Sequence, residues 1–515
     1  MNVKNLVILL SFSVLAVSCN RNKSGKSSVT GWNYNDKNMG GFQVAKATDQ
    51  KTGPGLVFVE GGTFTMGQTE EDVMGDWNNI PRRVSVPSFY IDRTEVANVH
   101  YREYLYWLNK VFDPTDPQNL PIVEGALPDT LSWRSELSYN EPMVEYYLRH
   151  PGFNYYPVVG VSWKQANDFC LWRSDRVNEG ILLQKGFVNK QSLNGQQGAD
   201  NFTTKSYLLG VGYQPPPGKG ATSKKNPLKT PQGQPRTNVT MEDGLLLPDY
   251  RLPFEAEWEY AAYGLIDQNP RTSTKKKRGE ELVQNRQVYP WSQNPNGLRD
   301  VRHGSWQGQF LANFKRGSGD NAGVAGGLND NAFYTADVKS FYPNAFGLYN
   351  MAGNVNEWVH DVFRPLSTLD FDDMPAPTRG NKFQTIVKDP STGEAMVNDT
   401  TGRVVMRDVT DEESKNRRNY QRGNVINYLD GDTASQASYG YGTTTLVSDH
   451  SRVYKGGSWN DRAYWLSPGT RRFLEEDQAL STLGFRCAMN SMGGAANGKG
   501  TRKTGNQFPT KRSKR

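Results

Sequence analysis

A stretch near the middle of the chain, residues 347–358, brings together residue types that bind a hard metal ion. Asn350 and Glu357 supply side-chain oxygens within it, and Gly353 and Asn354 lie between them. Glycine lets a backbone turn tightly and point successive carbonyls inward. Amide, carboxylate and carbonyl oxygens are the ligands that calcium prefers. The spacing is not that of an EF-hand, so the residues alone favour a capped turn before a strand.

Other chemistry has weaker support in the sequence. His360 and Asp361 follow Glu357 and suit acid–base work, although a loop-end histidine with solvated neighbours is commoner. The sequence lacks a zinc-like histidine pair at helical spacing, and Gly218-Lys219-Gly220 lacks the frame of a phosphate-binding loop. The five histidines are His100, His150, His303, His360 and His450.

Several segments predict the elements that must position these residues. Apolar runs at 56–59 and 63–66 flank Glu60-Gly61-Gly62 and predict a hairpin, and 84–91 predicts a further strand broken at Pro87. Three helices are expected. They are a helix over 99–112 capped by Asn98, one over 163–173 capped by Ser162 with Cys170 toward the core, and one with Pro253 in its first turn.

Ordered blocks of the sequence resemble the formylglycine-generating sulfatase-modifying enzyme family. The blocks are 60–67, 89–98, 156–163, 250–260, 347–358, 452–459 and 484–488. The resemblance implies an α+β fold of the formylglycine-generating-enzyme type, an elaborated C-type-lectin-like fold that is loop-rich with large insertions. The domain is expected to span 55–490.

The resemblance also bears on catalysis. The family's oxidation depends on two cysteines shortly after a Gly-Gly-Ser motif, here Gly456-Gly457-Ser458, because thiolates hold copper and exchange with the substrate cysteine. Aligned without gaps, the two positions are Asp461 and Leu466, and neither can do thiol chemistry. We therefore expect no oxidase activity and no copper. A divergent enzyme using Asp461 or His360 is a lower-ranked alternative.

Metal sites follow from the resemblance as well. One structural calcium site would use the Asn350 and Glu357 side chains with the carbonyls of Gly353 and Val355. A second site would fall near Asn313, the Phe314 carbonyl and Asp330, where the intervening loop differs from the family's.

The cysteines are assigned by position and by resemblance. Cys19 falls in a stretch that resembles a bacterial lipobox, and Cys170 and Cys487 occupy positions that form a structural bridge in the family. An exported compartment permits that disulfide. It would cost the unfolded chain conformational entropy worth about 3–5 kcal/mol. The alternative is two buried free thiols.

The N-terminus predicts export and a lipid anchor. Lys4 precedes an apolar run at 6–17 that is too short to span a bilayer comfortably, so 1–18 is interpreted as a lipoprotein signal peptide. Cys19 would then be the lipidated first residue, and 19–54 a flexible tether. An ordinary secretory signal is the alternative. The residues after Cys19 favour the periplasmic face of an outer membrane.

Insertions and the tail account for much of the length. The predicted insertions are 185–247, 265–287 and 363–450, and 491–515 is interpreted as a basic disordered tail. The formal net charge of the chain is +7. The seven Lys and Arg residues after Met492, with no acid among them, account for this excess, which argues against nucleic acid as a partner.

A narrower resemblance suggests the function. An exported lipoprotein of this fold without the catalytic cysteines resembles the gliding-motility and type IX secretion lipoproteins of Bacteroidetes, the GldJ and GldK/PorK proteins; 30–43 and 76–83 carry this likeness. It implies a non-catalytic assembly component whose partners are other proteins of that machine, including, in the GldK/PorK case, a periplasmic ring protein. The alternative is a glycan- or peptide-binding module of the cell envelope. Its cleft would be lined by Trp459, Tyr464, Trp465 and Arg471.

Overall fold

The computed structural model describes most of the predicted domain in two compact units. The described residues are 25–36, 38–40, 42–45, 50–68, 79, 81–136, 138–223, 228–230, 234–264, 287–291, 294, 296–305, 307–317, 330, 332–363, 383–414 and 450–493. The main unit comprises Asp49–Gly180, Leu193–Gln214 and Leu247–Arg515. The small unit comprises Met1–Thr48, Ile181–Ser192 and Pro215–Leu246. The predicted signal peptide, Cys19 and residues 494–515 of the predicted tail lie outside the described residues.

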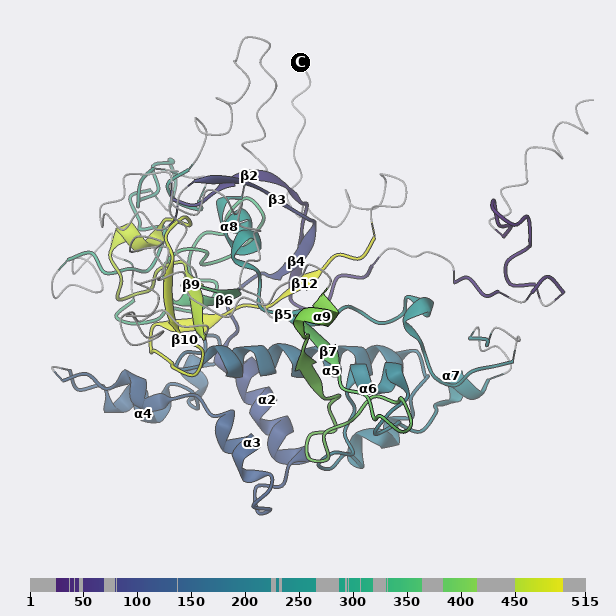
Figure 1. Cartoon of the computed structure of the whole chain (residues 1–515). Helices are drawn as coiled ribbons and strands as arrows, with labels where there is room; N and C mark the ends of the chain where they lie inside the picture. Colours follow the sequence, from purple (N-terminus) through teal and green to yellow (C-terminus); the bar gives the residue numbers. More distant parts are fainter. Residues whose placement is uncertain are drawn as a thin grey trace, which may run out of the picture. The chain divides into compact units, whose positions relative to one another are not determined.

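Two four-stranded sheets form the frame of the main unit (Figure 1). The first has the order β1-β4-β12-β5, with antiparallel pairing throughout. Its strands are β1 (Leu56–Val59), β4 (Phe89–Asp92), β12 (Ala488–Asn490) and β5 (Tyr250–Arg251). The second has the order β10-β9-β6-β11, in which β11 runs parallel to β6. Its strands are β10 (Arg472–Glu475), β9 (Ser451–Lys455), β6 (Asn356–Val362) and β11 (Leu483–Phe485).

Two smaller pairs complete the strands. β2 (Gly62–Met66) pairs with β3 (Arg82–Val86), and β7 (Gln384–Ile386) pairs with β8 (Met406–Asp408) inside the predicted 363–450 insertion. The sheets and helices together confirm the α+β class.

The helices vary from single turns to a 22-residue rod, α5. The α-helices are α2 (Asn98–Val111), α3 (Leu120–Gly125), α4 (Glu141–Tyr146), α5 (Trp163–Gln184), α6 (Thr204–Leu209), α7 (Lys219–Thr222), α8 (Glu255–Tyr263) and α9 (Asp411–Ser414). The short 3-10 helices are η1 (Thr130–Trp133), η2 (Pro151–Phe153), η3 (Lys190–Asn194), η4 (Met241–Asp243) and η8 (Ala463–Leu466). Within the described residues, the structure has no helix whose length and hydropathy suit a membrane crossing.

Aromatic packing joins the helices to the sheets. The Tyr101 ring of α2 stacks on Phe169 of α5 with centroids 5.7 Å apart, and Phe169 meets Phe485 of β11 at 5.4 Å. On another side, α8 packs against β2, β3 and β6 around the buried side chains of Phe64 and Trp258. Large rings bury much apolar area each, so these contacts hold the loop-rich frame together.

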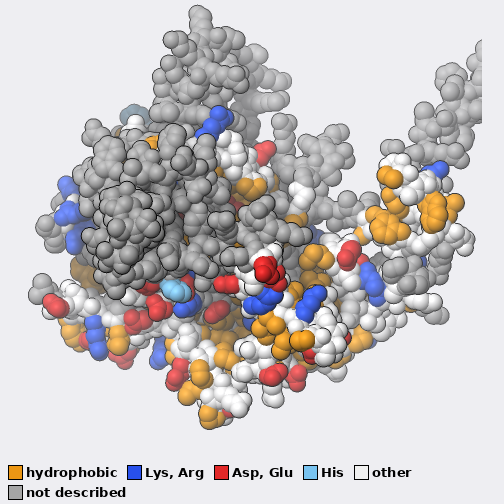
Figure 2. Space-filling model, in the orientation of Figure 1, with side chains coloured by type: hydrophobic (Ala, Val, Ile, Leu, Met, Phe, Trp, Pro, Cys, Tyr) orange, Lys and Arg blue, Asp and Glu red, His pale blue; other side chains and the backbone are white. Residues whose placement is uncertain are grey.

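Charged side chains of both signs are scattered over the described part of one face, where Figure 2 shows Lys and Arg interspersed with Asp and Glu. In the small unit, Arg236 and Asp243 form an ion pair next to η4, and Gly218 donates its N–H to the Phe187 carbonyl at 2.8 Å.

The structure corrects four local predictions. β1 pairs with β4 and β2 pairs with β3, so the predicted hairpin between β1 and β2 does not form. Ala97, rather than Asn98, precedes the first helical residue of α2, and the Asn98 amide donates instead to the carbonyls of Tyr147 and Phe153. α5 continues to Gln184. Pro253 lies before Phe254, the N-terminal cap of α8.

Candidate functional site

The predicted metal loop turns at three left-handed residues. Asn350, Gly353 and Asn354 have φ of 51°, 79° and 66°. A Cβ added to Gly353 would lie 2.4 Å from the Asn313 carbonyl oxygen, so only glycine fits there. The tight turn is therefore confirmed, and it packs directly on Asn313.

The structure brings the two predicted calcium sites together. The Asn354 N–H donates to the Asn313 carbonyl at 2.9 Å, and the Asn313 amide donates to the Tyr334 carbonyl at 2.7 Å. The Oδ1 atoms of Asn350 and Asn313 are buried and accept no hydrogen bond from any residue that the structure describes. Buried polar atoms without a partner are rare, so each amide oxygen is suited to a cation. Asp330 is buried, and its Oδ1 accepts from the Ala332 N–H.

Glu357 makes strong contacts within the fold. Its two carboxylate oxygens accept from the Nε and Nη2 of Arg486, and Oε2 also accepts from the Trp258 indole N–H at 2.7 Å. Both partners of the ion pair are almost fully buried. A carboxylate oxygen has further lone pairs, so this pairing does not exclude a cation, but it gives Glu357 a structural role without one.

A second carboxylate, which the sequence reasoning missed, lies beside the loop. Glu95 accepts from the Nδ2 atoms of Asn350 and Asn354 at 3.1 and 2.9 Å. Burial raises the pKa of Glu95 to about 8, against the opposing charge of Arg486. Asp92, Arg93 and Thr94 directly precede Glu95, so nothing in the local sequence marks its carboxylate as buried.

The position of the first expected catalytic cysteine holds an ion-paired carboxylate. The Asp461 carboxylate accepts hydrogen bonds from Nη1 and Nη2 of Arg472 at 2.7 Å each. It also accepts from the Ser458 hydroxyl at 2.6 Å and from the Asn356 amide at 3.0 Å. Burial alone raises the pKa of Asp461, but hydrogen bonds and charge from Arg472 outweigh it and lower the net pKa. Asp461 is thus held ionised as a structural anchor.

The position of the second expected cysteine belongs to the core. Leu466 is fully buried among Trp291, Phe310 and Leu311. A Cβ added to Gly457 would lie 2.9 Å from its Cδ2, so the Gly-Gly turn packs closely on it. This side chain fills space and carries no group for chemistry.

Comparison with known proteins places this fold. Residues 41–491 match the family model described as "Sulfatase-modifying factor enzyme 1-like domain". The chain belongs to this family.

Its relatives include active and inactive members. The formylglycine-generating enzyme of Thermomonospora curvata is 24% identical over 335 residues, covering 62% of this chain and 75% of that protein. The inactive C-alpha-formylglycine-generating enzyme 2 of Mus musculus is 24% identical over 344 residues, covering 63% and 73%. Among solved structures, PvdO from Pseudomonas aeruginosa is 14% identical with a TM-score of 0.38, covering 84% of this chain and 94% of that chain.

The two cysteines of the sulfatase-modifying-factor domain meet in the core. Cys170 on α5 and Cys487 next to β12 are buried thiols whose sulfur atoms lie 2.9 Å apart. Burial raises the pKa of the Cys170 thiol, so it is unreactive as a nucleophile in this state. The predicted partners therefore lie together, and the disulfide itself stays a prediction.

The acids of α8 form ion pairs within the fold. Glu255 pairs with Arg471 at 2.9 Å and Glu259 with Lys455 at 2.8 Å. Burial by itself raises the pKa of Glu255, but Arg471, Lys455 and Arg82 together hold it at about 2. Glu257 pairs with Arg251 at 2.7 Å.

His360 and Asp361 do not form an acid–base pair. The His360 ring packs against Trp163 and Phe254, and burial with nearby Arg251 and Arg452 lowers its pKa to about 3. Burial, aided by Glu255, raises the pKa of Asp361 to about 7. Asp361 Oδ2 accepts from the Glu255 N–H at 2.6 Å, so it caps α8 instead of contacting His360.

The predicted aromatic cleft is taken up by internal contacts. Trp459 is buried and stacks on Trp133 with centroids 6.0 Å apart. Arg471 is bound to Glu255, and the Arg472 guanidinium lies 4.4 Å from the Trp465 ring. The Tyr464 hydroxyl accepts from Gln68 at 2.7 Å. These side chains do not present an open platform for a sugar.

Proposed function

We propose that this chain is a non-catalytic member of its family and acts as an assembly component of a cell-envelope machine. The observation that carries the proposal is the Asp461–Arg472 ion pair at the expected catalytic position, with Leu466 closed into the core. A carboxylate anchored by four hydrogen bonds and a buried leucine leave no thiol pair to bind copper. An inactive relative in the mouse fits this assignment.

Catalysis is tested directly with the purified chain. A cysteine-containing sulfatase-type peptide, incubated with copper and oxygen, is expected to keep its thiol, as measured by mass spectrometry. An active formylglycine-generating enzyme serves as the positive control. Conversion of the peptide that disappears in the Asp461→Ala variant would refute the proposal.

The resemblance to gliding-motility and type IX secretion lipoproteins sets the finer proposal. The chain is an outer-membrane lipoprotein anchored through Cys19 on the periplasmic face, and its partners are components of that machine, including a periplasmic ring protein. The insertions support a partner role, since they build a β7–β8 hairpin and α6 beyond the metal loop and its sheets. Outside partners are a common use of such insertions.

A pull-down of the chain with its partners tests this finer proposal. The lipidated chain, tagged and isolated from gently solubilised envelopes, is expected to recover secretion and motility components absent from an untagged control. Radiolabelled palmitate is expected to enter the wild type and not Cys19→Ser. Recovery of the chain alone, with bound glycan, would favour the binding-module alternative.

We also propose a structural calcium ion at the metal loop. The unpartnered Asn350 Oδ1 fits it, and the Glu357 carboxylate and the carbonyls of Gly353 and Val355 complete the oxygen set that calcium takes. Bound calcium would fix the loop and supply no chemistry. Calcium is expected to raise the melting temperature of the wild type and not of Asn350→Ala, with Asn398→Ala as the surface control. An equal rise in the wild type and both variants would exclude this site.

A further inference from the structure

The main unit contains a pocket whose lining includes neither the metal loop nor Asp461. It has a volume of about 500 Å³ and lies between α2, α3 and α5. Aromatic rings form one wall, contributed by Tyr104 and Trp107 of α2 and by Trp172 of α5. The Tyr104 and Trp172 rings pack together with centroids 5.2 Å apart, so this wall is preformed.

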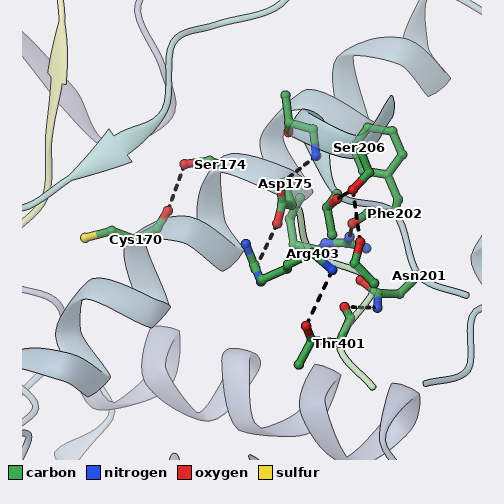
Figure 3. Close-up of polar contacts among 12 residues, drawn as sticks. Cys170, Ser174, Asp175, Asn201, Phe202, Ser206, Thr401 and Arg403 are labelled. Carbon is green, nitrogen blue, oxygen red and sulfur yellow. Dashed lines mark hydrogen bonds and ion pairs between the residues drawn. The ribbon is translucent and has the colours of Figure 1, made fainter. Parts of the chain in front are cut away.

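The two large insertions close the pocket. Asn201 from one insertion donates its amide to the Thr401 carbonyl of the other at 2.8 Å, and both residues line the pocket. Arg403, two residues further along, binds Asp175 of α5 at 2.9 Å (Figure 3). The Ser206 hydroxyl donates to the Gly402 carbonyl at 2.9 Å. The insertions therefore complete a pocket whose other walls come mainly from α2, α3 and α5.

Charge in the pocket is unbalanced. Each of its two cations already has an acidic partner outside the lining, Arg403 with Asp175 and Lys164 with Glu476 at 3.5 Å. The two acids of the lining, Asp168 and Asp477, make no ion pair with any residue that the structure describes. Solvent reaches both acids, so a ligand can reach them too.

The surroundings of Asp168 show that its charge is poorly compensated. Enclosure by the neighbouring helices raises its pKa, and the more distant charge of Arg403 only partly opposes this. The pKa of Tyr104 is raised, mainly by burial and further by the Asp168 charge, which places this carboxylate close to the aromatic wall. An uncompensated carboxylate beside aromatic rings is complementary to a cation with an apolar stem.

We propose that this pocket binds an arginine or lysine side chain of a partner polypeptide. The aliphatic stem would lie along the rings of Tyr104 and Trp172, and the cationic head would meet Asp168, with Asp477 at longer range. The inference deepens the assembly proposal, since a partner supplies the cation. Its test uses short peptides on the purified chain, so its failure is distinct from failure of the pull-down.

The experiment compares two immobilised peptides by biolayer interferometry. Both are capped glycine-rich pentapeptides, one with a central arginine and the other with citrulline, which has the same shape without the charge. The full chain is expected to bind the arginine peptide more tightly, with an affinity that falls as salt rises. Asp168→Asn is expected to weaken this binding about tenfold. The matched control is Asp399→Asn, an exposed acid between β7 and β8 that does not line the pocket.

A second variant and a truncation separate the remaining explanations. Gly125 lines the pocket and has open space around its Cβ position, so Gly125→Phe is expected to obstruct binding while the protein stays folded. Equal binding of the arginine and citrulline peptides, or an unchanged affinity in Asp168→Asn, would overturn the proposal. If ending the chain at Gly493 tightens peptide binding severalfold, the chain's own basic tail is the occupant, and the assignment to a partner is wrong.

Discussion

At the scale of single residues, the buried pair Glu357–Arg486 is expected to matter most for stability. Both side chains are almost fully buried, so removing one charge leaves the other without compensation. Glu357→Gln is expected to cost about 3–5 kcal/mol of unfolding free energy, measured by urea denaturation. Glu413→Gln breaks the exposed pair with Arg407 and serves as the control, with no measurable change expected. Equal effects of the two variants would contradict the role given to burial.

Asp361 gives the protein a specific pH dependence. Its pKa is about 7 in the folded protein against 3.8 for the ordinary group, so the folded state holds this proton where the unfolded chain has lost it. The resulting stability is present below pH 4 and is lost as the pH rises toward 7, at about 1.4 kcal/mol per pH unit. Urea denaturation from pH 4.5 to 8 should show this decline in the wild type and a flatter profile in Asp361→Asn. Parallel profiles would exclude Asp361 as the cause.

Residue types and spacing predicted only the local part of the site. The turn at Gly353 and Asn354 follows from local backbone preferences, so the sequence was enough to predict it. The contact of Asn350 with Glu95 joins residues 255 positions apart, and that of Arg486 with Glu357 spans 129. Pairings of this range depend on the completed fold, and no local pattern carries them.

At the scale of elements, the pairing of β6 with β9 suggests that the 363–450 insertion can be removed without unfolding the domain. The two strands pair antiparallel, and the Phe363 N–H donates to the Ser451 carbonyl at 2.8 Å, so the ends of the insertion already meet. Replacing 364–449 by a short Gly-Ser linker is therefore expected to leave the fold intact, because a shorter loop costs less closure entropy. Circular dichroism and urea denaturation check this expectation.

The same excision tests the role of the insertion. It removes the β7–β8 hairpin and with it Thr401 and Arg403 of the pocket, so partner recovery in the pull-down is expected to fall while the remaining protein stays folded. Full recovery of the partners by a folded excised chain would show that the insertion does not serve assembly.

Strand and helix positions were easier to predict than their partners. The runs at 56–59 and 63–66 are strands, but β1 pairs with β4 and β2 with β3. The Gly61 backbone packs against Val86, where a Cβ would lie 2.4 Å from its carbonyl, and this long-range contact selects the pairing. The helix beginning at Trp163 was expected from the Ser162 cap, whereas its extension to Gln184 depends on contacts such as Asn178 with Leu247.

At the scale of the whole molecule, the sheets tie distant parts of the chain together. β12, near the end of the described chain, lies between β4 and β5, and β11 pairs with β6. The domain therefore closes only when its last strands are in place. Family blocks made this closure predictable in outline, since their order along the chain matches the family's. The contact between the two insertions was not predictable, because those segments lack the family's pattern.

The cysteine pair permits a further test, because a disulfide would link α5 covalently to the segment that holds the last strands. Cys170 and Cys487 are 317 residues apart in sequence and 2.9 Å apart between sulfur atoms. In an exported protein we expect them to be oxidised, and a loop of that length would restrict the unfolded chain by roughly 5 kcal/mol. Protein isolated from the envelope should resist alkylation at both positions until it is unfolded and reduced, as measured by mass spectrometry. Reduction should lower the melting temperature of the wild type and leave that of Cys170→Ser unchanged. Ready alkylation of both thiols in unfolded, unreduced protein would show that they are buried free thiols, held together by packing alone.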